Sequence, residues 1–374
     1  MLELARHRSQ ATVTRVTNSP ETVGPLLASL TTLRLGGPAR AIVRCTETDA
    51  LVATVLDLDS RGESVLIVGG GSNLVIGDDG FDGTAVVVAS TGIEYAEEDG
   101  RPYVIAEAGN DWDALVADTV AAGFGGLECL SGIPGAAGTT PVQNVGAYGV
   151  EVADILREVR LLSRATGQTR WVGPDALDLA YRTSSLKGRD AEVVLAVSFW
   201  LNPDGVSAPI AYRELATALG VEPGGTAEAA RVRERVLELR RGKGMVLDDA
   251  DHDTWSAGSF FTNPIVPESQ VDDILARITE RVGPDVAVPR YPADAGVKLS
   301  AGWLIERAGF TRGFPGDDAA ARLSTKHTLA LTNRGSATTA DLLALAGRVR
   351  DGVRDAFGVD LHPEPVLVNC QLPR

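Results

Sequence analysis

The sequence predicts an α+β fold made of two units, each with its own strands and helices. Three observations lead to this prediction. Short apolar segments typical of strands and longer amphipathic repeats typical of helices are mixed along the chain. Glycine-rich loops gather in the first half, and the texture of the sequence changes at Gly205–Gly225, which we take as the domain boundary. A chain of 374 residues is long enough for two or three domains with a sizeable core.

Strands and a helix follow one another at the start of the first half. Segments rich in valine, leucine and isoleucine, bounded by turn residues, are predicted to be strands. Thr48 is predicted to cap an amphipathic helix that ends at Gly62. The predicted strands of this region are Ala39–Cys45, Ser64–Val68, Leu74–Ile76 and Thr84–Ala89.

The strand at Ser64–Val68 runs directly into a glycine-rich loop, Gly69–Asn73. A Rossmann dinucleotide-binding loop has the pattern G-x-G-x-x-G and opens a helix. Here another strand follows the glycines, which leaves no room for a helix. If this loop binds phosphates, bare backbone amides must hold them without a helix dipole. A tight turn between two strands is the structural alternative.

A longer loop, Ser131–Gly149, is the segment around which the rest of the chain is organised. It contains five glycines, interleaved with amide and phenol side chains. Glycine lets the backbone approach a flat or phosphorylated ligand closely, so we expect a ligand-binding loop. An irregular surface loop is the alternative. Asn110 is predicted to cap the helix before this loop, with Asp113 at the N3 position and Gly123 at the end.

The remaining predicted elements complete the first unit and build the second, which spans residues 225–358. Thr339–Phe357 is the longest predicted helix, and Gly358 ends it. The other predicted elements are strands at Ile155–Ser163, Glu192–Leu201, Phe260–Val266, Thr328–Thr332 and Val366–Val368, and helices at Glu228–Arg241, at 271–282 and from Ser300.

Charge and cysteine content limit the environment and the partners. The formal charge of −15 would repel a phosphate backbone, so no nucleic-acid partner is expected, and an anionic ligand needs a local basic cluster. Cys45, Cys129 and Cys370 lack metal-ligand spacing, so we expect no metal, no disulfide framework and a cytoplasmic location. Residues 1–20 are predicted to be a polar, mobile leader, and no segment has the length of a signal peptide core or a membrane span.

Seven motifs follow one another along the chain. They are LTTLRLGGPA (Leu30–Ala39), GGGSN (Gly69–Asn73), LSGIPGAAGTTPVQNVGAYG (Leu130–Gly149), YRTSSLK (Tyr181–Lys187), AGSFFTNP (Ala257–Pro264), KLSAGWLIERAGF (Lys298–Phe310) and HPEP (His362–Pro365). In this order they resemble the motifs of the UDP-N-acetylenolpyruvoylglucosamine reductases, bacterial flavoenzymes that complete UDP-N-acetylmuramic acid for peptidoglycan. Each motif alone is weak, but the ordered set is highly specific and covers roughly residues 25–370.

The resemblance implies an FAD-binding domain of the vanillyl-alcohol-oxidase type over residues 21–224, in subdomains of about 21–90 and 91–224. A smaller α+β substrate-binding domain would follow over 225–358, and a C-terminal strand within 359–374 would return to the first domain. No histidine lies near the first glycine loop, where flavin-linking members of the wider fold tend to place one, so non-covalent FAD is expected. The residues implied to bind FAD are Gly69, Gly70, Gly71, Ser72, Asn73, Ser131, Gly132, Ile133, Pro134, Gly135, Asn144, Gly146, Ala147 and Gly149.

The implied reaction reduces an enolpyruvyl ether with NADPH as co-substrate. NADPH reduces FAD, the flavin N5 delivers hydride to the terminal vinyl carbon, and the adjacent carbon then needs an acid. Arg182 and Glu364 match the catalytic arginine and glutamate of the family, and Ser259 matches its proton donor. Glu364 must be protonated to donate a hydrogen bond, so its pKa should be raised. Without the resemblance, the three would be a surface arginine, a solvated loop glutamate and a turn serine.

Further matches lie on the substrate side. Tyr212 resembles a capping tyrosine on a mobile loop, with a core tyrosine as the alternative. Arg240 and Lys243 resemble a basic pair that meets the nucleotide diphosphate, and a positively charged helix C-terminus is the alternative. The expected partners are a UDP-sugar and NADPH, and the protein is expected to be a monomer. The residues implied to bind substrate are Tyr148, Tyr181, Tyr212, Arg240, Lys243, Asn263 and Lys298.

Two other functions fit parts of the sequence. An FAD-dependent sugar or alcohol oxidase of the same fold would use oxygen as its acceptor. The absence of a flavin-linking histidine and the motifs that carry Ser259, Arg182 and Glu364 argue against it. A non-catalytic nucleotide-sugar binder would keep the fold but would be colourless when purified.

Overall fold

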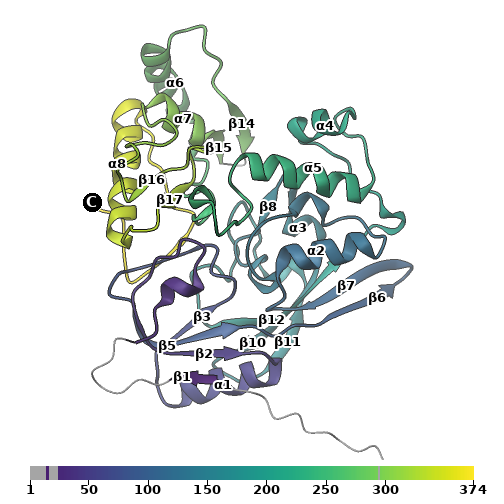
Figure 1. Ribbon diagram of the computed structural model, residues 1–374. Helices are drawn as coiled ribbons and strands as arrows, with labels where there is room; N and C mark the ends of the chain where they lie inside the picture. The colour runs from purple at the N-terminus through teal and green to yellow at the C-terminus, as the bar shows by residue number, and fades with distance from the viewer. Residues whose placement is uncertain (1–13, 17–23, 294) are drawn as a thin grey trace, which may run out of the picture.

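The structure is a computed structural model that describes residues 14–16, 24–293 and 295–374 (Figure 1). Two sheets form the lower part of the molecule in this view, and a part that carries α6, α7 and α8 rises above one end of them. Among the described residues, none of the helices is both long enough and apolar enough to cross a bilayer.

The first sheet has the strand order β1-β2-β5-β3, in which only β1 is antiparallel to its neighbour. Its β1 lies within the predicted leader, and the other residues of 1–20 lie outside the described residues. Helix α1 (Thr48–Ser60) follows β2, but Glu47 rather than Thr48 is its N-cap. The Thr48 hydroxyl donates to Glu107 Oε2 at 2.6 Å instead. The strands are β1 (Thr14–Val16), β2 (Ala39–Cys45), β3 (Val65–Val68) and β5 (Phe81–Val88).

The second sheet is antiparallel throughout, with the order β11-β10-β12-β7-β6. Helix α2 (Trp112–Ala121) lies over one face, and α5 (Ala229–Gly242) lies beyond α2 (Figure 1). Trp112 of α2 and Val236 of α5 are buried in one core with Phe199 of β12. The strands are β6 (Ile93–Glu98), β7 (Arg101–Glu107), β10 (Leu156–Ser163), β11 (Thr169–Val172) and β12 (Glu192–Trp200).

The N-cap of α2 differs by one residue from the prediction. Asp111, not Asn110, accepts a hydrogen bond from Ala114 N, at 2.8 Å. The Asn110 amide is used as a donor instead, to the carbonyl oxygens of Gly92 and Glu107 at 2.8 Å each. Two adjacent residues of good capping type compete here, and the tertiary contacts of Asn110 decide between them.

The change of texture at Gly205–Gly225 does not coincide with a change of core. Helix α4 (Arg213–Leu219) lies inside this segment, and its Leu215 is buried in the same core as α5. The chain therefore crosses back over the second sheet after residue 205. Packing thus favours a boundary after α5 instead of at residue 225.

The helix-rich part forms its own core around α8 (Thr339–Phe357). The predicted strand Phe260–Val266 is regular only at its end, whereas Phe260 and Phe261 before it are irregular and buried in this core. The strand predicted at Thr328–Thr332 begins later, because Thr328 lies in a turn. The elements are β13 (Ile265–Val266), α6 (Glu268–Val282), β14 (Arg290–Ala293), β15 (Gly296–Leu299), α7 (Ala301–Arg307), β16 (Ala321–Leu323) and β17 (Leu331–Asn333).

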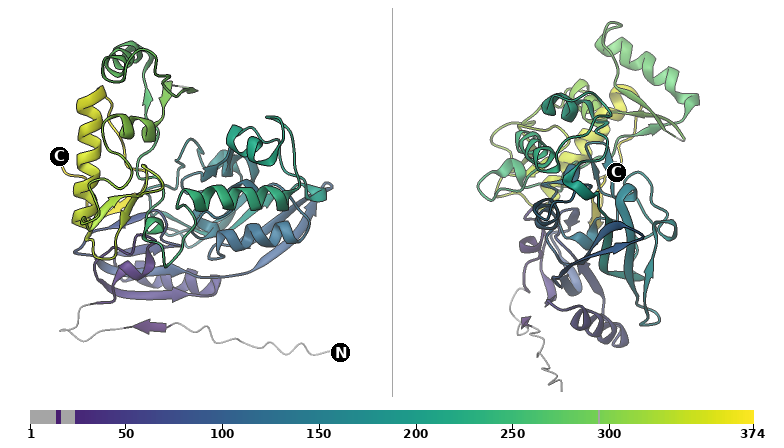
Figure 2. Two further views of the ribbon diagram at one scale, coloured as in Figure 1. Left: turned by 45° about the horizontal axis from the view of Figure 1, so that its top comes forward. Right: turned by 90° about the vertical axis from the view of Figure 1, so that its right-hand side faces the viewer.

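The C-terminal segment returns to the first part of the chain. Strand β18 (Val366–Val368) pairs in parallel with β4 (Leu74–Ile76), which confirms the predicted return. The end of the chain lies against α8 (Figure 2), where Arg350 Nη2 donates to Pro373 O at 2.6 Å. The remaining elements are β8 (Gly146–Ala147), β9 (Val150–Glu151) and α3 (Val152–Ile155), and 3-10 helices at Leu27–Leu30, Glu128–Leu130, Ala137–Thr139, Pro174–Ala176, Pro203–Gly205 and His252–Thr254.

Candidate functional site

A cavity of about 670 Å³ is lined by segments of both sheets and of the helix-rich part. Its volume is typical of small-molecule and cofactor sites, which span roughly 300–1,000 Å³. The lining comes from both glycine loops, the segment after Tyr181, the end of α5 and the segment before β18. The predicted site residues that line it are Gly69, Gly71, Ser72, Asn73, Ile133, Pro134, Gly135, Gly146, Tyr181, Arg182, Arg240, Ser259, Asn263 and Glu364.

The other predicted site residues stand behind this lining or beside it. Six of them belong to the glycine loops: Gly70, Ser131, Gly132, Asn144, Ala147 and Gly149. Tyr148, Tyr212 and Lys243 form a cluster near the end of α5, and Lys298 lies beside Tyr181.

The two glycine loops pack against each other at one wall of the cavity. A Cβ atom on Gly70 would lie 2.7 Å from the carbonyl carbon of Gly135 and 2.8 Å from Ala136 N. Gly71 has a φ of +62°, and a Cβ there would lie 2.8 Å from the Leu30 carbonyl carbon. Side chains are therefore excluded, and bare backbone forms this wall. Strand β4 follows the first loop directly, as the sequence predicts.

An ion-paired carboxylate fixes the second loop from behind. Asp113 accepts a hydrogen bond from Gly132 N at 2.6 Å, and from the two Nη atoms of Arg233 at 2.5 and 2.9 Å. The Ser131 hydroxyl donates to Glu128 O at 2.6 Å. Ser131 and Gly132 thus keep the loop in shape. The sequence indicated a helix terminus for Asp113 and no contact with Arg233, which follows 120 residues later.

Asn144 supports the loop from its buried side. Its Nδ2 donates to Glu151 Oε2 at 2.9 Å and to Ala180 O at 3.1 Å, and its Oδ1 accepts from Ala153 N at 2.9 Å. With a φ of +47°, Asn144 turns the chain toward Gly146, which does line the cavity. Its amide therefore positions the backbone of this wall.

The three predicted catalytic residues come from distant segments and line the same cavity. Glu364 N donates to Phe260 O at 2.9 Å, which holds the segment after Ser259 alongside the segment before β18. Arg182 approaches from a third segment, and its Nε lies 3.7 Å from Glu364 Oε1. The fold thus brings a hydroxyl, a guanidinium and a carboxyl group to one place.

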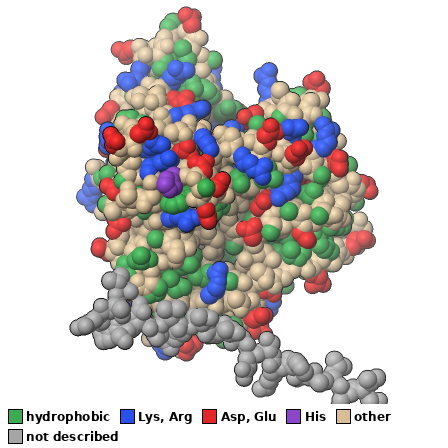
Figure 3. Space-filling model, viewed as in Figure 1, with side chains coloured by type: hydrophobic (Ala, Val, Ile, Leu, Met, Phe, Trp, Pro, Cys, Tyr) green, Lys and Arg blue, Asp and Glu red, His purple; other side chains and the backbone are tan. Residues whose placement is uncertain are grey.

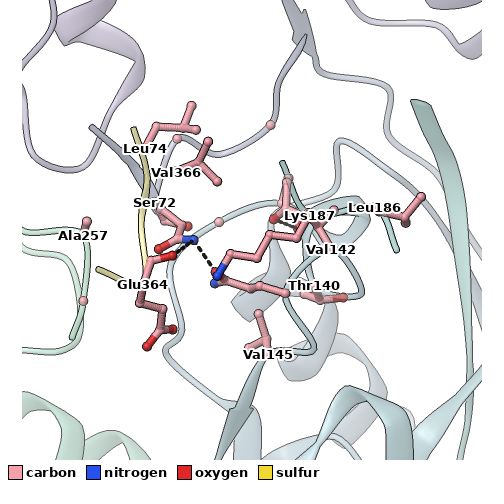
Figure 4. Close-up of a pocket in the computed structure, with 18 of the residues that line it drawn as sticks. Ser72, Leu74, Thr140, Val142, Val145, Leu186, Lys187, Ala257, Glu364 and Val366 are labelled. Atoms are coloured by element: carbon pink, nitrogen blue, oxygen red, sulfur yellow. Dashed lines mark hydrogen bonds between the residues drawn. The ribbon is translucent and has the colours of Figure 1, made fainter. Parts of the chain in front are cut away.

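Burial and the neighbouring positive charges shift the pKa of Glu364 in opposite directions. Burial raises the pKa of Glu364, while the positive charges of Arg182 and Lys187 counteract this rise. Figure 4 shows Lys187 and Glu364 reaching into the pocket from different segments. Lys187 Nζ donates to Arg182 O at 3.0 Å, and burial lowers the pKa of Lys187. Glu364 can therefore keep its proton to a higher pH than an exposed glutamate.

An aromatic ring with two cations forms the next part of the site. Lys298 Nζ lies 4.6 Å from the ring centroid of Tyr181, and Arg182 Cζ lies 5.1 Å from it. Burial raises the pKa of Tyr181, and the neighbouring Asn263 counteracts this rise. Asn263 Oδ1 accepts from Ala301 N at 2.9 Å, which fixes it at the start of α7. This group offers positive charge and polar atoms beside Arg182.

The last turn of α5 contributes a buried guanidinium. Arg240 Nη2 donates to Met245 O at 2.8 Å, whereas its Nε is buried without a hydrogen-bond partner among the described residues. Burial lowers the pKa of Arg240 to about 10. A buried donor that lacks a partner is rare in folded proteins, and it fits an anionic ligand in this cavity.

Lys243, three residues later, lies in a surface cluster. Its Nζ pairs with Glu214 Oε2 at 2.6 Å and lies 5.9 Å from the Tyr148 ring. Tyr212 contacts Tyr148 edge to face, with centroids 5.4 Å apart, and is 43% exposed. Tyr212 is therefore not a core tyrosine. The cluster belongs to the part that carries α4, and Figure 3 shows the surface notched between this part and the one that carries α6.

Two family models match the chain. The model of an FAD-binding domain matches residues 39–173, and the model of the C-terminal domain of UDP-N-acetylenolpyruvoylglucosamine reductase matches 249–368. The second match begins after α5, in agreement with the packing.

Relatives named UDP-N-acetylenolpyruvoylglucosamine reductase match nearly the whole chain. The protein of Nocardia farcinica (strain IFM 10152) is 65% identical over 346 residues, which cover 92% of this chain and 89% of that protein. The protein of Saccharopolyspora erythraea is 59% identical over 366 residues, which cover 97% and 100%. The chain belongs to the UDP-N-acetylenolpyruvoylglucosamine reductase family.

A solved structure shows the same fold. The crystal structure of the family's reductase from Thermus caldophilus aligns with a TM-score of 0.61 at 23% identity, over 96% of this chain and all of that one. The predicted family and the α+β fold with a vanillyl-alcohol-oxidase-type FAD-binding domain are thus confirmed. The protein is an oxidoreductase with an FAD-binding domain.

The cavity fits the cofactor that this reductase family implies. FAD carries two phosphates, and the loop segments Gly69–Asn73 and Ile133–Gly135 line the cavity with main chain that can present backbone N–H groups to phosphate. The unpartnered Nε of Arg240 lies beside the second loop, 3.4 Å from where a Cβ on Gly132 would lie, and it leaves a buried donor for a second anionic group.

Glu151 is the site residue that the sequence analysis did not name, although it follows the long glycine loop by two residues. Lys187, which closes the YRTSSLK motif, and His327 were expected only as neighbours of the site, with no role assigned. Burial, and then the charges of Lys243, Arg312 and Arg240, lowers the pKa of His327 to about 4. The contacts of Glu151 are visible only in three dimensions.

Proposed function

We propose that this protein reduces the enolpyruvyl ether of UDP-N-acetylenolpyruvoylglucosamine to UDP-N-acetylmuramate with NADPH, in peptidoglycan precursor synthesis. The observation that carries this proposal is the convergence of Ser259, Arg182 and Glu364 on a cavity that is also lined by both glycine loops. Membership of the reductase family supports the same substrate.

The FAD-binding residues of this proposal are the ones at the glycine wall. Gly69–Asn73 and Ile133–Gly135 would hold the cofactor through backbone amides, without a covalent link. Bound FAD would supply the redox chemistry, taking hydride from NADPH and giving it to the terminal vinyl carbon of the substrate. The side chains of the cavity would bind and orient the substrate for that transfer.

Arg182 and Glu364 would receive the substrate carboxylate. As hydride reaches the vinyl group, negative charge spreads into this carboxylate, so a cation and a hydrogen-bond donor stabilise the transition state. Arg182 supplies the cation through the part of its guanidinium that faces Glu364. Glu364 donates only while it is protonated, and its burial favours that form.

Ser259 would give the proton to the carbon next to the carboxylate. A serine hydroxyl is a weak acid, but a carbanion beside a carboxylate is basic enough to take its proton. The hydrogen bond between Phe260 O and Glu364 N supports this role, because it keeps Ser259 next to the group that binds the carboxylate.

The nucleotide part of the substrate would lie along the remaining polar residues. Arg240 and Lys243 would contact the diphosphate, and Lys243 would first have to leave Glu214. The exposed Tyr212 and its neighbour Tyr148 would cover this part of the substrate. Tyr181, Asn263 and Lys298 would complete the wall beside Arg182, in a substrate-binding domain that begins after α5.

Anaerobic mixing tests the function directly. The purified protein should be yellow, NADPH should bleach the flavin absorbance, and UDP-N-acetylenolpyruvoylglucosamine should restore it. Bleaching by a sugar or alcohol and recovery only with oxygen would identify an oxidase instead. A colourless protein that binds the nucleotide sugar and does not take up added FAD would be a non-catalytic binder.

A further inference from the structure

Arg182 is held by a set of contacts that leave one side of its guanidinium toward the cavity. Its Nη2 donates to Gly146 O at 2.7 Å, and its Nη1 lies 3.3 Å from Asn144 O and 3.2 Å from Glu151 Oε1. Its Nε faces Glu364 at 3.7 Å, which is beyond hydrogen-bond range. The two Nη atoms are therefore hydrogen-bonded to the loop, and Nε faces the carboxyl group of Glu364.

Glu151 is the anion of this set, and it uses both of its oxygens. Oε1 accepts from Arg182 Nη1, and Oε2 accepts from Asn144 Nδ2 at 2.9 Å. Its backbone is fixed as well, because Glu151 pairs with Gly146 in the β8–β9 hairpin and its N–H donates to Asp154 Oδ2 at 2.7 Å. One carboxylate thus joins the arginine to the loop whose shape depends on Asn144.

We infer that Glu151 is a positioning residue of the reaction, whose carboxylate aims the guanidinium of Arg182 at the substrate carboxylate. The positive charge of Arg182 is then divided between Glu151 and Glu364. This inference rests on the proposed function. Arg182 has a φ of +56°, a conformation that is uncommon outside glycine. Its backbone is thus held in an unusual conformation, and three hydrogen bonds of its guanidinium fix the side chain.

The shared charge gives the inference an electrostatic consequence. The charged or titratable groups that face Glu364 are Arg182, Lys187 and Tyr181. Glu151 pairs with Arg182 from the other side, so it draws part of that positive charge away from Glu364. Without the negative charge of Glu151, Arg182 would favour the ionised form of Glu364 more strongly, and Glu364 would lose its proton at lower pH.

Glu151→Gln tests this role. Two donors meet the carboxylate, but glutamine offers one acceptor and one donor, so one contact must be lost. We expect flavin reduction by NADPH, flavin content and thermal unfolding midpoint to stay at the wild-type level. Reoxidation by the enolpyruvyl substrate should slow by about 10- to 100-fold, the effect of a displacement of about 1 Å at a reacting group. The alkaline limb of the pH profile of reoxidation should move to lower pH.

Two further variants keep the result interpretable. Glu158→Gln makes the same change in a carboxylate that pairs with Arg157 instead of Arg182, and it should leave reoxidation unchanged. Glu151→Asp keeps the charge and both oxygens, so it should restore the position of the alkaline limb and part of the rate. Loss of flavin in both Glu151 variants, equal slowing of both half-reactions, or an unmoved limb in Glu151→Gln would overturn the inference. If the wild-type protein itself fails to be reoxidised by this substrate, the proposed function fails instead.

Discussion

The contact between the two glycine loops gives the sharpest structural prediction. In Gly70→Ala the new methyl group would lie 2.7 Å from the carbonyl carbon of Gly135 and 2.8 Å from Ala136 N. Carbon atoms pack at about 3.5–4.0 Å, so the loops would have to separate by about 1 Å. The obstacle is backbone, which cannot move away as a flexible side chain can. Overpacking of this kind costs about 1–3 kcal/mol.

If the strain is relieved by separation of the two glycine loops, it should appear as weaker FAD binding. A cost of about 1–3 kcal/mol corresponds to about 5- to 150-fold in the dissociation constant. Fluorescence titration of the apoprotein with FAD measures this change, and the flavin content after purification gives a second readout. Gly173→Ala is the matched control, because its Cβ would have nothing within 4 Å and its φ of −77° suits alanine.

Unchanged FAD affinity in Gly70→Ala would refute the assignment of this wall to the cofactor. Equal losses in Gly70→Ala and Gly173→Ala would point to general damage by added methyl groups. Either result would leave the two glycine loops without the role proposed for them.

Two further predictions concern the charges of the site. Because burial raises the pKa of Glu364, reoxidation by substrate should fall only as the pH rises above the ordinary range of a glutamate. Glu364→Gln should abolish this alkaline limb, since an amide donates at every pH. Stopped-flow traces across pH measure the limb, and a limb that persists in Glu364→Gln would belong to another group. Glu214→Gln should tighten UDP binding by up to about fivefold, since a partly exposed ion pair contributes about 1 kcal/mol or less and Lys243 would be free for the diphosphate. Calorimetric titration measures the affinity for UDP. Glu238→Gln is the control because Glu238 pairs with Arg235. Weaker UDP binding by Glu214→Gln would show that Glu214 supports the site.

Elements with complete local signals could be predicted from the sequence. Helix α8 begins with a capping box formed by Thr338 and Asp341 and ends at Gly358 in the left-handed conformation. Residues close in sequence therefore determine both of its ends. The boundary predicted at Gly205–Gly225 has no such complete local signal. Glycine and proline there mark an exposed connection, but only the packing of Leu215 shows that the chain stays on the same core.

The site divides in the same way. Ordered motifs were enough to name Ser259, Arg182 and Glu364, and the structure places all three along one cavity. Glu151 could not be found from the sequence, because its role depends on which side chains reach its two oxygens. Such contacts are set by loop conformation, here by the positive φ of Asn144 and Arg182, and loop conformation is poorly encoded in local sequence.

The half-reactions of Ser259→Ala test the central claim most directly. In an anaerobic stopped-flow experiment, bleaching of the flavin by NADPH should proceed at the wild-type rate, since Ser259 takes no part in that step. Reoxidation by UDP-N-acetylenolpyruvoylglucosamine should slow by about 10²-fold or more, the usual contribution of a positioned acid. Reoxidation at the wild-type rate would contradict the claim that Ser259 protonates the substrate.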